Sequence, residues 1–466
     1  MNKLTKTIVC ALCAITAAFS FGACNLSGEV INAYDIAVKN GFTGTEKEWL
    51  LSLNGKDGKD GEDGKDVTVD QLFAAAVAEG YEGSKLDFIK QLVAEYNANN
   101  ETKTIAKTVT SVVSIFCGFE RTIQGYLNNR TEISSSGGSG VILDINHNSG
   151  TAYVVTNYHV VYNANSDTGI SNSIYLYSYG GLCGFSSTTG KDDTGFGMKA
   201  EFIGGAMDYD IALLKVTGSE LLKNSNLTAA SFGDSNQVKV GEKTFAVGNS
   251  NGLGVSVTSG ILSVDSETIN MKSSDGKRTV GYRVMRTDAS VNHGNSGGGL
   301  FDVSGKLIGI TNAKNVEDET DNICYALPIT QVKYLLKNIW DTLQAGAQKG
   351  YVSRAMLGVE TTFSDSSLYL DNDGELAVKE TFYVRKVTQG SAADGVFQTM
   401  DIIQAVTING VTTQFSRRYL MQDIMLTIRK GDSVVFTVLR DKQSGEGKET
   451  VQLTVTFRDN DFVRYA

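Results

Sequence analysis

The chain has 466 residues, which is too long for a single hydrophobic core, so we expect about two to four domains. Hydrophobic residues make up 41% of it and charged residues 20%, values typical of a folded, soluble protein. A net charge of −10 without any basic stripe argues against general nucleic-acid binding, and 50 glycines predict many tight turns.

Residues 1–23 are predicted to be a signal peptide of the lipoprotein type. After a start with two lysines, residues 8–21 form a mostly apolar stretch that is too short to span a bilayer. The stretch ends in Phe21-Gly22-Ala23-Cys24, which resembles a bacterial lipobox with phenylalanine in place of the usual leucine. We expect lipid on Cys24 to anchor the protein to the outer face of the cell membrane. The alternative is an ordinary cleaved signal followed by a coincidental cysteine.

Residues 24–103 are predicted to form a helical repeat region. Segment 37–53 returns 39 positions later, and each copy has the pattern of a helix, a glycine turn and a second helix. Between the copies, residues 55–66 form four Gly-X-Y triplets that resemble collagen but contain no proline. A hydrophilic linker is therefore the favoured interpretation, and association with other subunits is the alternative.

Residues 104–343 have the pattern of a β-rich domain. Short β-branched and aromatic runs are separated by Gly, Asn, Asp and Ser, and no long helix intervenes before the helical period of residues 330–343. We expect a barrel or sandwich with strands at 111–116, 140–143, 153–156, 174–177, 211–216, 244–247, 260–264 and 307–310. After a polar connection, residues 351–458 have the pattern of a second, smaller β-rich domain.

Three short strings in this region carry the residues of a catalytic triad. His159 lies in Thr156-Asn157-Tyr158-His159-Val160-Val161, Asp210 precedes an apolar strand, and Ser296 lies in Gly294-Asn295-Ser296-Gly297-Gly298. His, Asp and Ser in this order are a recurrent arrangement for nucleophilic acyl transfer. His159 would take the proton of Ser296, and Asp210 would fix the imidazole tautomer. We therefore predict a serine peptidase.

The glycines around Ser296 predict an oxyanion hole at Gly294 and Asn295. They allow a tight turn that directs N–H groups, notably those of Gly294 and Ser296, at one spot, while Asn295 helps to shape the loop.

Each of the three strings also has a non-catalytic interpretation. A glycine-rich serine turn is common, His159 could be a core histidine, and Asp210 could simply end a turn. Their conjunction favours catalysis. Of the other histidines, His147 is expected to be a turn residue, and His293 is expected to face solvent or a neighbouring loop.

The strings that flank these residues resemble the HtrA/Deg family of trypsin-like serine peptidases with a C-terminal PDZ domain. The resemblance covers about residues 104–457 and includes the strings at 137–142, 156–161, 210–216, 257–261, 294–300 and 325–329. It implies a mainly β fold with a trypsin-like double β-barrel at 104–343 and a PDZ domain at 351–458. It also implies a catalytic cleft between the barrels, with His159 and Asp210 from the first barrel and Ser296 from the second.

The resemblance extends to residues that would bind substrate. Ala355, Met356, Leu357, Gly358 and Val359 are similar to the loop whose N–H groups receive a peptide C-terminal carboxylate. The alternative is a PDZ-shaped domain used only for packing. Met400 stands where the family usually has glycine, and Val291, beside Ser290, predicts a preference for small to medium aliphatic side chains.

Residues 180–197 look like an insertion relative to the simplest family members. They are rich in Gly, Ser and Thr and predict a long surface loop, with regulation by contact to a neighbouring subunit as the alternative.

Three cysteines remain once the signal peptide and Cys24 are set aside. Cys117, Cys183 and Cys324 have no metal-ligand spacing, and Cys117 and Cys324 are expected to be inert core residues. A disulfide between two of the three stays open.

The favoured function is the degradation of misfolded or exposed polypeptides outside the cytoplasm of a bacterium. No phosphate loop or metal-ligand cluster is present in the sequence, so we expect no cofactor. The resemblance implies a homotrimer, recognition of peptide C-termini, and an oxyanion loop that can rest in an inactive shape. The alternatives are a peptide-binding sensor or holdase with minor proteolysis, and a scaffold built on the repeat at 34–99.

Overall fold

A computed structural model describes residues 69–126, 128–312, 323–370, 376–443 and 445–466, together with three short pieces of the first 68 residues. Two of those pieces are the paired strands β1 (Ala23–Cys24) and β2 (Val30–Ile31). The predicted signal peptide, the lipid site on the Cys24 side chain, the first copy of the repeat and the linker at 55–66 lie outside what is described. No helix among the described residues is long and apolar enough to cross a membrane.

The chain divides into two compact units, Met1–Lys103 and Thr104–Ala466. In the first unit, helix α4 (Val69–Ala78) is followed by helix α5 (Lys85–Val109), which continues into the second unit. Gly80 lies between them with a φ of 101°, a left-handed conformation that favours glycine. The rings of Phe73, Tyr81 and Phe88 pack together across this turn. The second copy of the repeat is therefore a helix, a glycine turn and a helix, as predicted.

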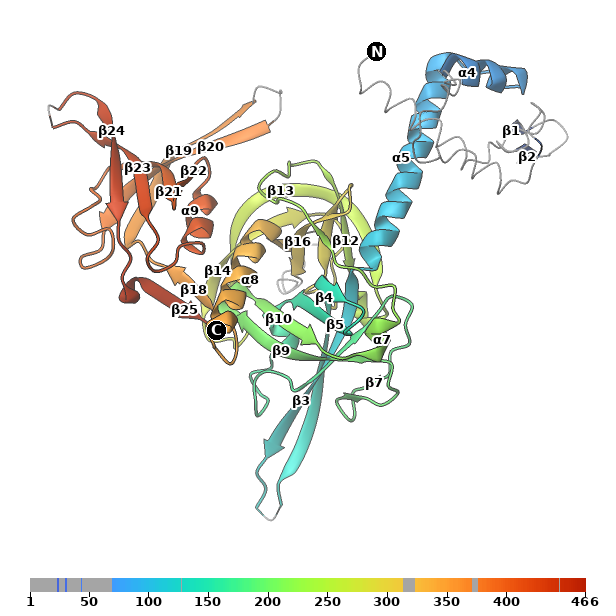
Figure 1. The fold of residues 1–466 in the computed structure, drawn as a ribbon, viewed down its shortest axis with the longest axis horizontal. Coiled ribbons are helices and arrows are strands. Elements are labelled where there is room, and N and C mark those ends of the chain that lie inside the picture. Colours follow the sequence, from blue (N-terminus) through green and yellow to red (C-terminus); the bar gives the residue numbers. More distant parts are fainter. Residues whose placement is uncertain are drawn as a thin grey trace. The chain divides into compact units, whose positions relative to one another are not determined.

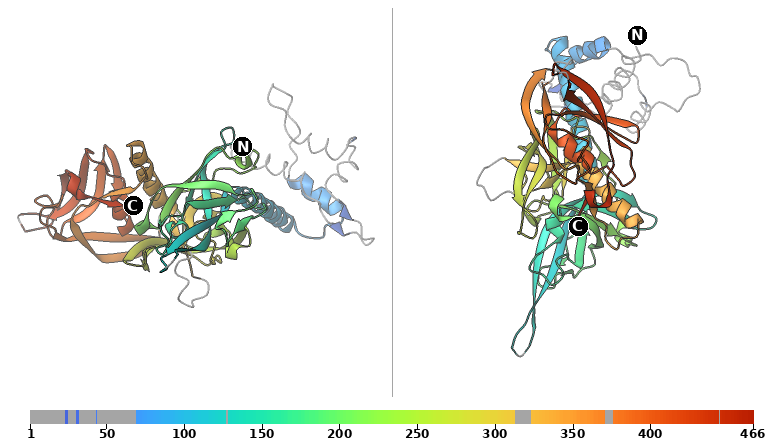
Figure 2. Two further views of the ribbon diagram at one scale, coloured as in Figure 1. Left: turned by 90° about the horizontal axis from the view of Figure 1, so that it is seen from below. Right: turned by 90° about the vertical axis from the view of Figure 1, so that its left-hand side faces the viewer.

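The second unit begins with a closed β-barrel whose strand order is β10-β5-β4-β3-β6-β9 (Figure 1). The strands are β3 (Val112–Ile123), β4 (Arg130–Asn146), β5 (Thr151–Thr156), β6 (Ser173–Tyr177), β9 (Met198–Ala206) and β10 (Ile211–Val216). Alternate apolar side chains such as Ile115, Ile142 and Leu214 fill its core. Figure 2 shows β3 and β4 continuing beyond the barrel as a long hairpin.

Short elements decorate this first barrel. They are the helices α6 (Tyr158–Val161) and α7 (Glu220–Lys223), and the two-residue strands β7 (Phe185–Ser186) and β8 (Lys191–Asp192). The paired strands β7 and β8 lie within residues 180–197, where the sequence predicted a long surface loop. The carboxylate of Asp192 organises this segment, because it accepts hydrogen bonds from Tyr177, Thr194 and the N–H of Gly197.

A second barrel follows with the strand order β16-β15-β12-β13-β14-β17, and the pairing of β16 with β17 closes the ring. Its strands are β12 (Lys243–Gly248), β13 (Ser256–Lys272), β14 (Thr279–Thr287), β15 (Gly299–Asp302), β16 (Lys306–Asn312) and β17 (Cys324–Pro328). Strand β11 (Ser231–Phe232) pairs with β16 in parallel outside the ring. Helix α8 (Ile329–Gln344) then ends this domain, close to the predicted bounds of 330–343. The double barrel implied by the family resemblance is thus present.

The C-terminal part forms a further β-sheet with its own apolar core. Its elements are β19 (Val359–Leu370), β20 (Leu376–Val387), β21 (Ile402–Ile408), β22 (Val411–Gln414), α9 (Arg418–Met425), β23 (Val434–Asp441) and β24 (Lys448–Val455). Strand β18 (Val352–Ala355) pairs with β25 (Phe462–Tyr465) as a separate ribbon. Met400, which replaces a glycine, has a φ of 71° and so adopts the left-handed conformation that glycine favours.

The C-terminal domain packs on the second barrel through buried polar groups. The guanidinium of Arg283 on β14 forms an ion pair with Asp423 on α9, and both side chains are almost fully buried. Gln331 on α8 donates to the same carboxylate at 3.0 Å, and Asn338 donates to the carbonyl of Leu426 at 2.7 Å. Because a buried charge that loses its partner is strongly disfavoured, these contacts fix how the two domains meet.

The three remaining cysteines are free thiols with very different exposure. Cys117 and Cys324 are buried, and burial raises the pKa of Cys117 to about 12 and raises that of Cys324 as well. Cys183 is exposed. The disulfide that the sequence left open is therefore absent among these three.

We expect a thiol reagent to modify Cys183 rapidly in the folded protein and to modify Cys117 and Cys324 only after unfolding. The thiolate is the reactive form, and burial suppresses both access and ionisation. Peptide mapping by mass spectrometry after brief iodoacetamide treatment measures this, with a Cys183→Ser variant as control. Equal labelling of all three thiols in the folded protein would show that their assigned burial is wrong.

Candidate active site

The register of two neighbouring strands places His159 beside Asp210. Strands β5 and β10 are antiparallel, with Thr156 opposite Ala212, so the end of β5 lies next to the start of β10. His159 follows β5 on the short helix α6. Asp210 ends the 3-10 turn Met207–Tyr209 with a φ of 52°, a left-handed conformation that aspartate tolerates better than most residues.

Asp210 is completely buried and holds the imidazole of His159 in a defined orientation. Its Oδ2 lies 2.7 Å from Nδ1 of His159, and its Oδ1 accepts the backbone N–H of His159 at 3.0 Å. A carboxylate only accepts hydrogen bonds, so Nδ1 carries the proton and Nε2 is the basic nitrogen. This is the tautomer that a general base for a serine hydroxyl requires.

Two residues that the sequence analysis did not identify also bind this carboxylate. Asn312, at the end of β16, donates to Oδ2 of Asp210 at 2.9 Å. Ser274, in the turn between β13 and β14, donates to Oδ1 at 3.3 Å. Both come from the second barrel, so Asp210 joins the two barrels. No local pattern marks them, because they lie 102 and 64 residues away from Asp210 in the chain.

Ser296 lies in a turn that is hydrogen-bonded to both barrels. Its carbonyl accepts the N–H of Ser139 on β4 at 2.8 Å, and the hydroxyl of Ser139 donates to the carbonyl of Gly294 at 2.7 Å. On the other side, the N–H of Gly297 donates to Thr311 at 2.9 Å. Gly297 has a φ of 84°, and a Cβ there would lie 2.2 Å from the carbonyl oxygen of Ser139, so only glycine fits.

The oxyanion turn has the geometry of a type II β-turn. The N–H of Asn295 donates to the carbonyl of Asn292 at 3.0 Å, and Gly294 has a φ of 95° at the third position. The Asn295 N–H is thus engaged within the turn. Asn295 shapes this loop, and its carbonyl accepts the hydroxyl of Thr311 at 2.5 Å. The N–H groups of Gly294 and Ser296 are the remaining candidates.

The other two histidines have structural or solvent-facing positions. The ring nitrogens of His147 lie 2.9 Å from the carbonyl of Leu222 and 3.0 Å from that of Leu227, which ties together a loop of the first barrel. His293 is exposed in the oxyanion turn, as expected.

The predicted substrate-binding residues are placed in two regions. Val291 is buried in an apolar cluster of the second barrel, and its N–H donates to Sγ of Cys324 at 3.2 Å. In the C-terminal domain, Ala355 belongs to strand β18, and the N–H of Met356 donates to the backbone carbonyl of Asp461 at 2.6 Å. The N–H of Met356 is therefore not free to bind a carboxylate. The residues of this loop that remain candidates for binding a peptide carboxylate are Leu357, Gly358 and Val359.

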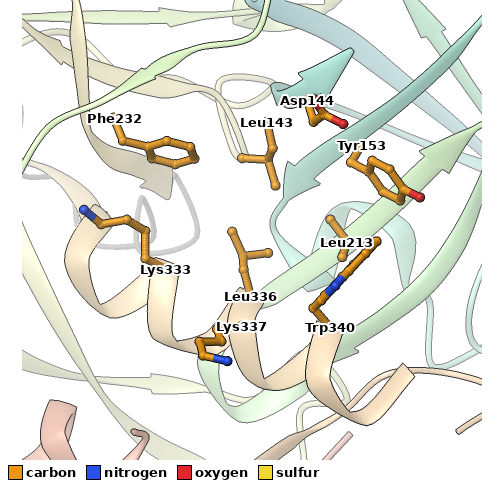
Figure 3. Close-up of a pocket in the computed structure, with 9 residues that line it drawn as sticks. All are labelled: Leu143, Asp144, Tyr153, Leu213, Phe232, Lys333, Leu336, Lys337 and Trp340. Atoms are coloured by element: carbon orange, nitrogen blue, oxygen red, sulfur yellow. The ribbon is translucent and has the colours of Figure 1, made fainter. Parts of the chain in front are cut away.

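An apolar cavity of about 380 Å³ lies away from these residues, between the first barrel and α8. Leu143, Phe232 and Leu336 face its space in Figure 3, with Trp340 and Lys333 at its edge. None of the triad residues lines it. The chemistry of the site is therefore carried by the barrel junction and not by this cavity.

Comparison with known proteins agrees with this geometry. Residues 138–310 match the description "Trypsin-like peptidase domain". The Serine protease Do-like HtrB of Bacillus subtilis (strain 168) is 30% identical over 390 residues, which cover 78% of this chain and 74% of that protein. The chain belongs to the HtrA family of serine proteases.

Further relatives are similar to this chain at somewhat lower identity. The Serine protease Do-like HtrA of Bacillus subtilis (strain 168) is 29% identical, and the match covers 66% of this chain and 62% of that protein. Among solved structures, the HtrA-type protease AlgW with decapeptide is 22% identical with a TM-score of 0.47, and the match covers 77% of this chain and 98% of that one.

We expect Asn312→Ala to lower kcat/KM by about tenfold to a hundredfold, because a hydrogen bond to a buried carboxylate contributes about 1.5–3 kcal/mol. Ser274→Ala should have a smaller effect, because its hydrogen bond is longer. Steady-state cleavage of a fluorogenic peptide measures both variants, with unfolding temperatures recorded in parallel. Unchanged kcat/KM in Asn312→Ala would mean that the amide does not support Asp210.

Proposed function

We propose that this protein is a serine endopeptidase that degrades misfolded or exposed polypeptides outside the cytoplasm. Ser296 is the nucleophile, His159 the general base and Asp210 the residue that orients it. The observation that carries the proposal is the 2.7 Å contact between His159 and a fully buried Asp210 carboxylate. Relatives with matching sequence include a "Probable periplasmic serine protease do/HhoA-like" of Haemophilus influenzae, 32% identical over 317 residues, which supports the location.

The proposed reaction uses these groups in the order typical of a serine peptidase. Oγ of Ser296 attacks the scissile carbonyl carbon and its proton passes to Nε2 of His159. The carbonyl oxygen becomes an oxyanion, which the N–H groups of Gly294 and Ser296 stabilise. His159 then protonates the leaving amine, the C–N bond breaks, and a water molecule hydrolyses the acyl-enzyme by the same route. Buried Asp210 stabilises the imidazolium at each step.

The C-terminal domain is proposed to bind the C-termini of substrate peptides through Leu357, Gly358 and Val359. Gly358 has a φ of 82°, which turns successive N–H groups of this loop toward one side. Edge binding of an extended peptide to a β-sheet is the corresponding recognition mode. Val291 is proposed to help shape the pocket for small to medium aliphatic side chains.

Assembly and anchoring complete the proposal. A lipid on Cys24 would hold the protein at the outer face of the cell membrane, and a homotrimer is the proposed oligomer. The mechanism above uses only side chains and backbone N–H groups of this chain and needs no cofactor.

We expect Ser296→Ala to abolish casein degradation, with a loss of at least about 10³-fold in kcat, because the covalent route is removed. His293→Ala is the matched control and should retain activity close to that of the wild type, since His293 is exposed. Loss of activity in His293→Ala with retention in Ser296→Ala would overturn the assignment. If the wild-type protein cleaves nothing but suppresses aggregation, the holdase interpretation is favoured instead.

We expect Gly358→Ala to weaken binding of hydrophobic C-terminal peptides by about tenfold or more. An added Cβ would lie 2.1 Å from the Cβ of Ser391, and the φ of 82° is strained for alanine, so the loop must shift. Fluorescence anisotropy with a free-acid peptide and its amidated form measures this. The control is Gly390→Ala, where φ is also positive but no atom lies within 4 Å of the added Cβ. Equal binding of acid and amide would contradict recognition of the carboxylate.

A further inference from the structure

A second cavity of about 370 Å³ lies where the C-terminal domain meets the protease domain. Its wall combines the 3-10 turn before Asp210, strand β14, strand β18, helix α9 and strand β25. Unlike the apolar cavity beside α8, it is lined by arginine, tyrosine and glutamine side chains. Those used below are Asp208, Arg278, Tyr282, Arg283 and Arg354.

Two of the three arginines in this wall are neutralised by carboxylates. Arg278 pairs with Asp208 at 2.7 Å, and Arg283 pairs with Asp423. Arg354 differs, because no carboxylate among the described residues forms an ion pair with it. Its Nη1 donates to the hydroxyl of Tyr209 at 3.4 Å, its side chain also bonds Tyr465, and its Nε is buried without a hydrogen-bond partner in the described part of the chain. Arg354 therefore contributes a positive charge to the wall that no ion pair neutralises.

Tyr282 supplies a second unused donor to the same wall. Its side chain is 3% exposed, and within the described residues its hydroxyl has no hydrogen-bond partner. Burial raises the pKa of this phenol, so it remains protonated and can donate a hydrogen bond at neutral pH. Buried polar groups in native proteins are almost always hydrogen-bonded, so an unused phenol in the same wall as a guanidinium with an unused, buried Nε indicates a ligand.

We propose that this cavity binds a small organic oxyanion, a carboxylate or a phosphate ester, through Arg354 and Tyr282. A guanidinium presents a planar set of N–H donors that matches two oxygens of either group, and the phenol adds a third donor. The carboxylates nearest the site, Asp208 and Asp423, are already paired with arginines and so do not repel the ligand strongly. A cation is disfavoured by the excess positive charge.

The position of the site gives the ligand a regulatory effect. The wall contains residues of the protease domain and of the C-terminal domain, so a bound anion stabilises their docked arrangement. Asp208 also lies in the turn that ends at Asp210, and Tyr282 is close enough to Asp210 for that charge to raise the pKa of its phenol. Occupancy of the cavity should therefore alter the rate of peptide cleavage as well as the stability of the domain junction.

The test is isothermal titration of the full-length mature protein at constant ionic strength, with chloride as the background anion. Inorganic phosphate and citrate are the two probes, so that phosphate and carboxylate binding are distinguished. We expect saturable binding of at least one probe by the wild type. Arg354→Gln should weaken it by at least about tenfold, because charge-assisted hydrogen bonds are lost. Tyr282→Phe, which removes only the unused hydroxyl, should weaken it about threefold or more without lowering the unfolding temperature in chloride.

Arg464→Gln is the matched control. Arg464 is the neighbour of Tyr465, which lines the cavity, but its own side chain is exposed and stacks on Tyr351 outside the cavity. It should bind the probe as the wild type does. The proposal is overturned if the wild type binds neither probe saturably, or if Arg464→Gln weakens binding as much as Arg354→Gln. If Arg354→Gln fails to fold, the affinity of Tyr282→Phe for the probe is the test. An affinity equal to that of the wild type would overturn the proposal.

Discussion

The buried carboxylate of Asp210 is the group on which the rest of the active site depends. It accepts hydrogen bonds from His159 in the first barrel and from Asn312 and Ser274 in the second. A charged group with no exposed surface is tolerated only when its oxygens are satisfied, so the two barrels must remain in register for this aspartate to stay buried. The packing of the two barrels and the orientation of the His159 imidazole therefore depend on the same hydrogen bonds to Asp210.

The turn that carries Ser296 also depends on hydrogen bonds between the two barrels. Ser139 of the first barrel donates to the carbonyls of both Ser296 and Gly294, and its hydroxyl also accepts the N–H of Asn249. Strand β14 links this centre to the C-terminal domain, because it follows the turn containing Ser274 and also carries Arg283, whose partner Asp423 lies on α9. Strand β14 therefore lies between the contacts of Asp210 and the contacts of the C-terminal domain.

Sequence patterns were sufficient where the determining interactions are local. Short β-branched and aromatic runs between turn residues indicated the barrel strands, and three short strings marked His159, Asp210 and Ser296 as candidates for the triad. The helical turn at His159 was missed because α6 has only four residues, too few for a period. Ser274 and Asn312 were missed because their relation to Asp210 exists only after the barrels pack. The backbone hydrogen bonds that the N–H groups of Asn295 and Met356 donate were not predicted either, because they do not depend on which side chains these residues carry.

In the C-terminal domain, too, local features could be predicted from the sequence and contacts between distant residues could not. Met400 was recognisable as an unusual residue at a glycine position, and its positive φ follows from the turn that precedes Asp401. The buried pair of Arg283 and Asp423 could not be recognised, because each residue by itself looks like an ordinary surface charge. Interfaces built from buried ion pairs depend on complementary positions in two separate domains, and only the folded chain brings these together.

The most direct test of the account is the rate at which a fluorophosphonate probe labels Ser296 in the wild type and in Asp210→Asn, with the labelled peptide identified by mass spectrometry. The account predicts a single label on Ser296 in the wild type and a rate about 10⁴-fold lower in Asp210→Asn, because the amide favours the wrong imidazole tautomer. Labelling of a different serine, or an equal rate in both proteins, would contradict it.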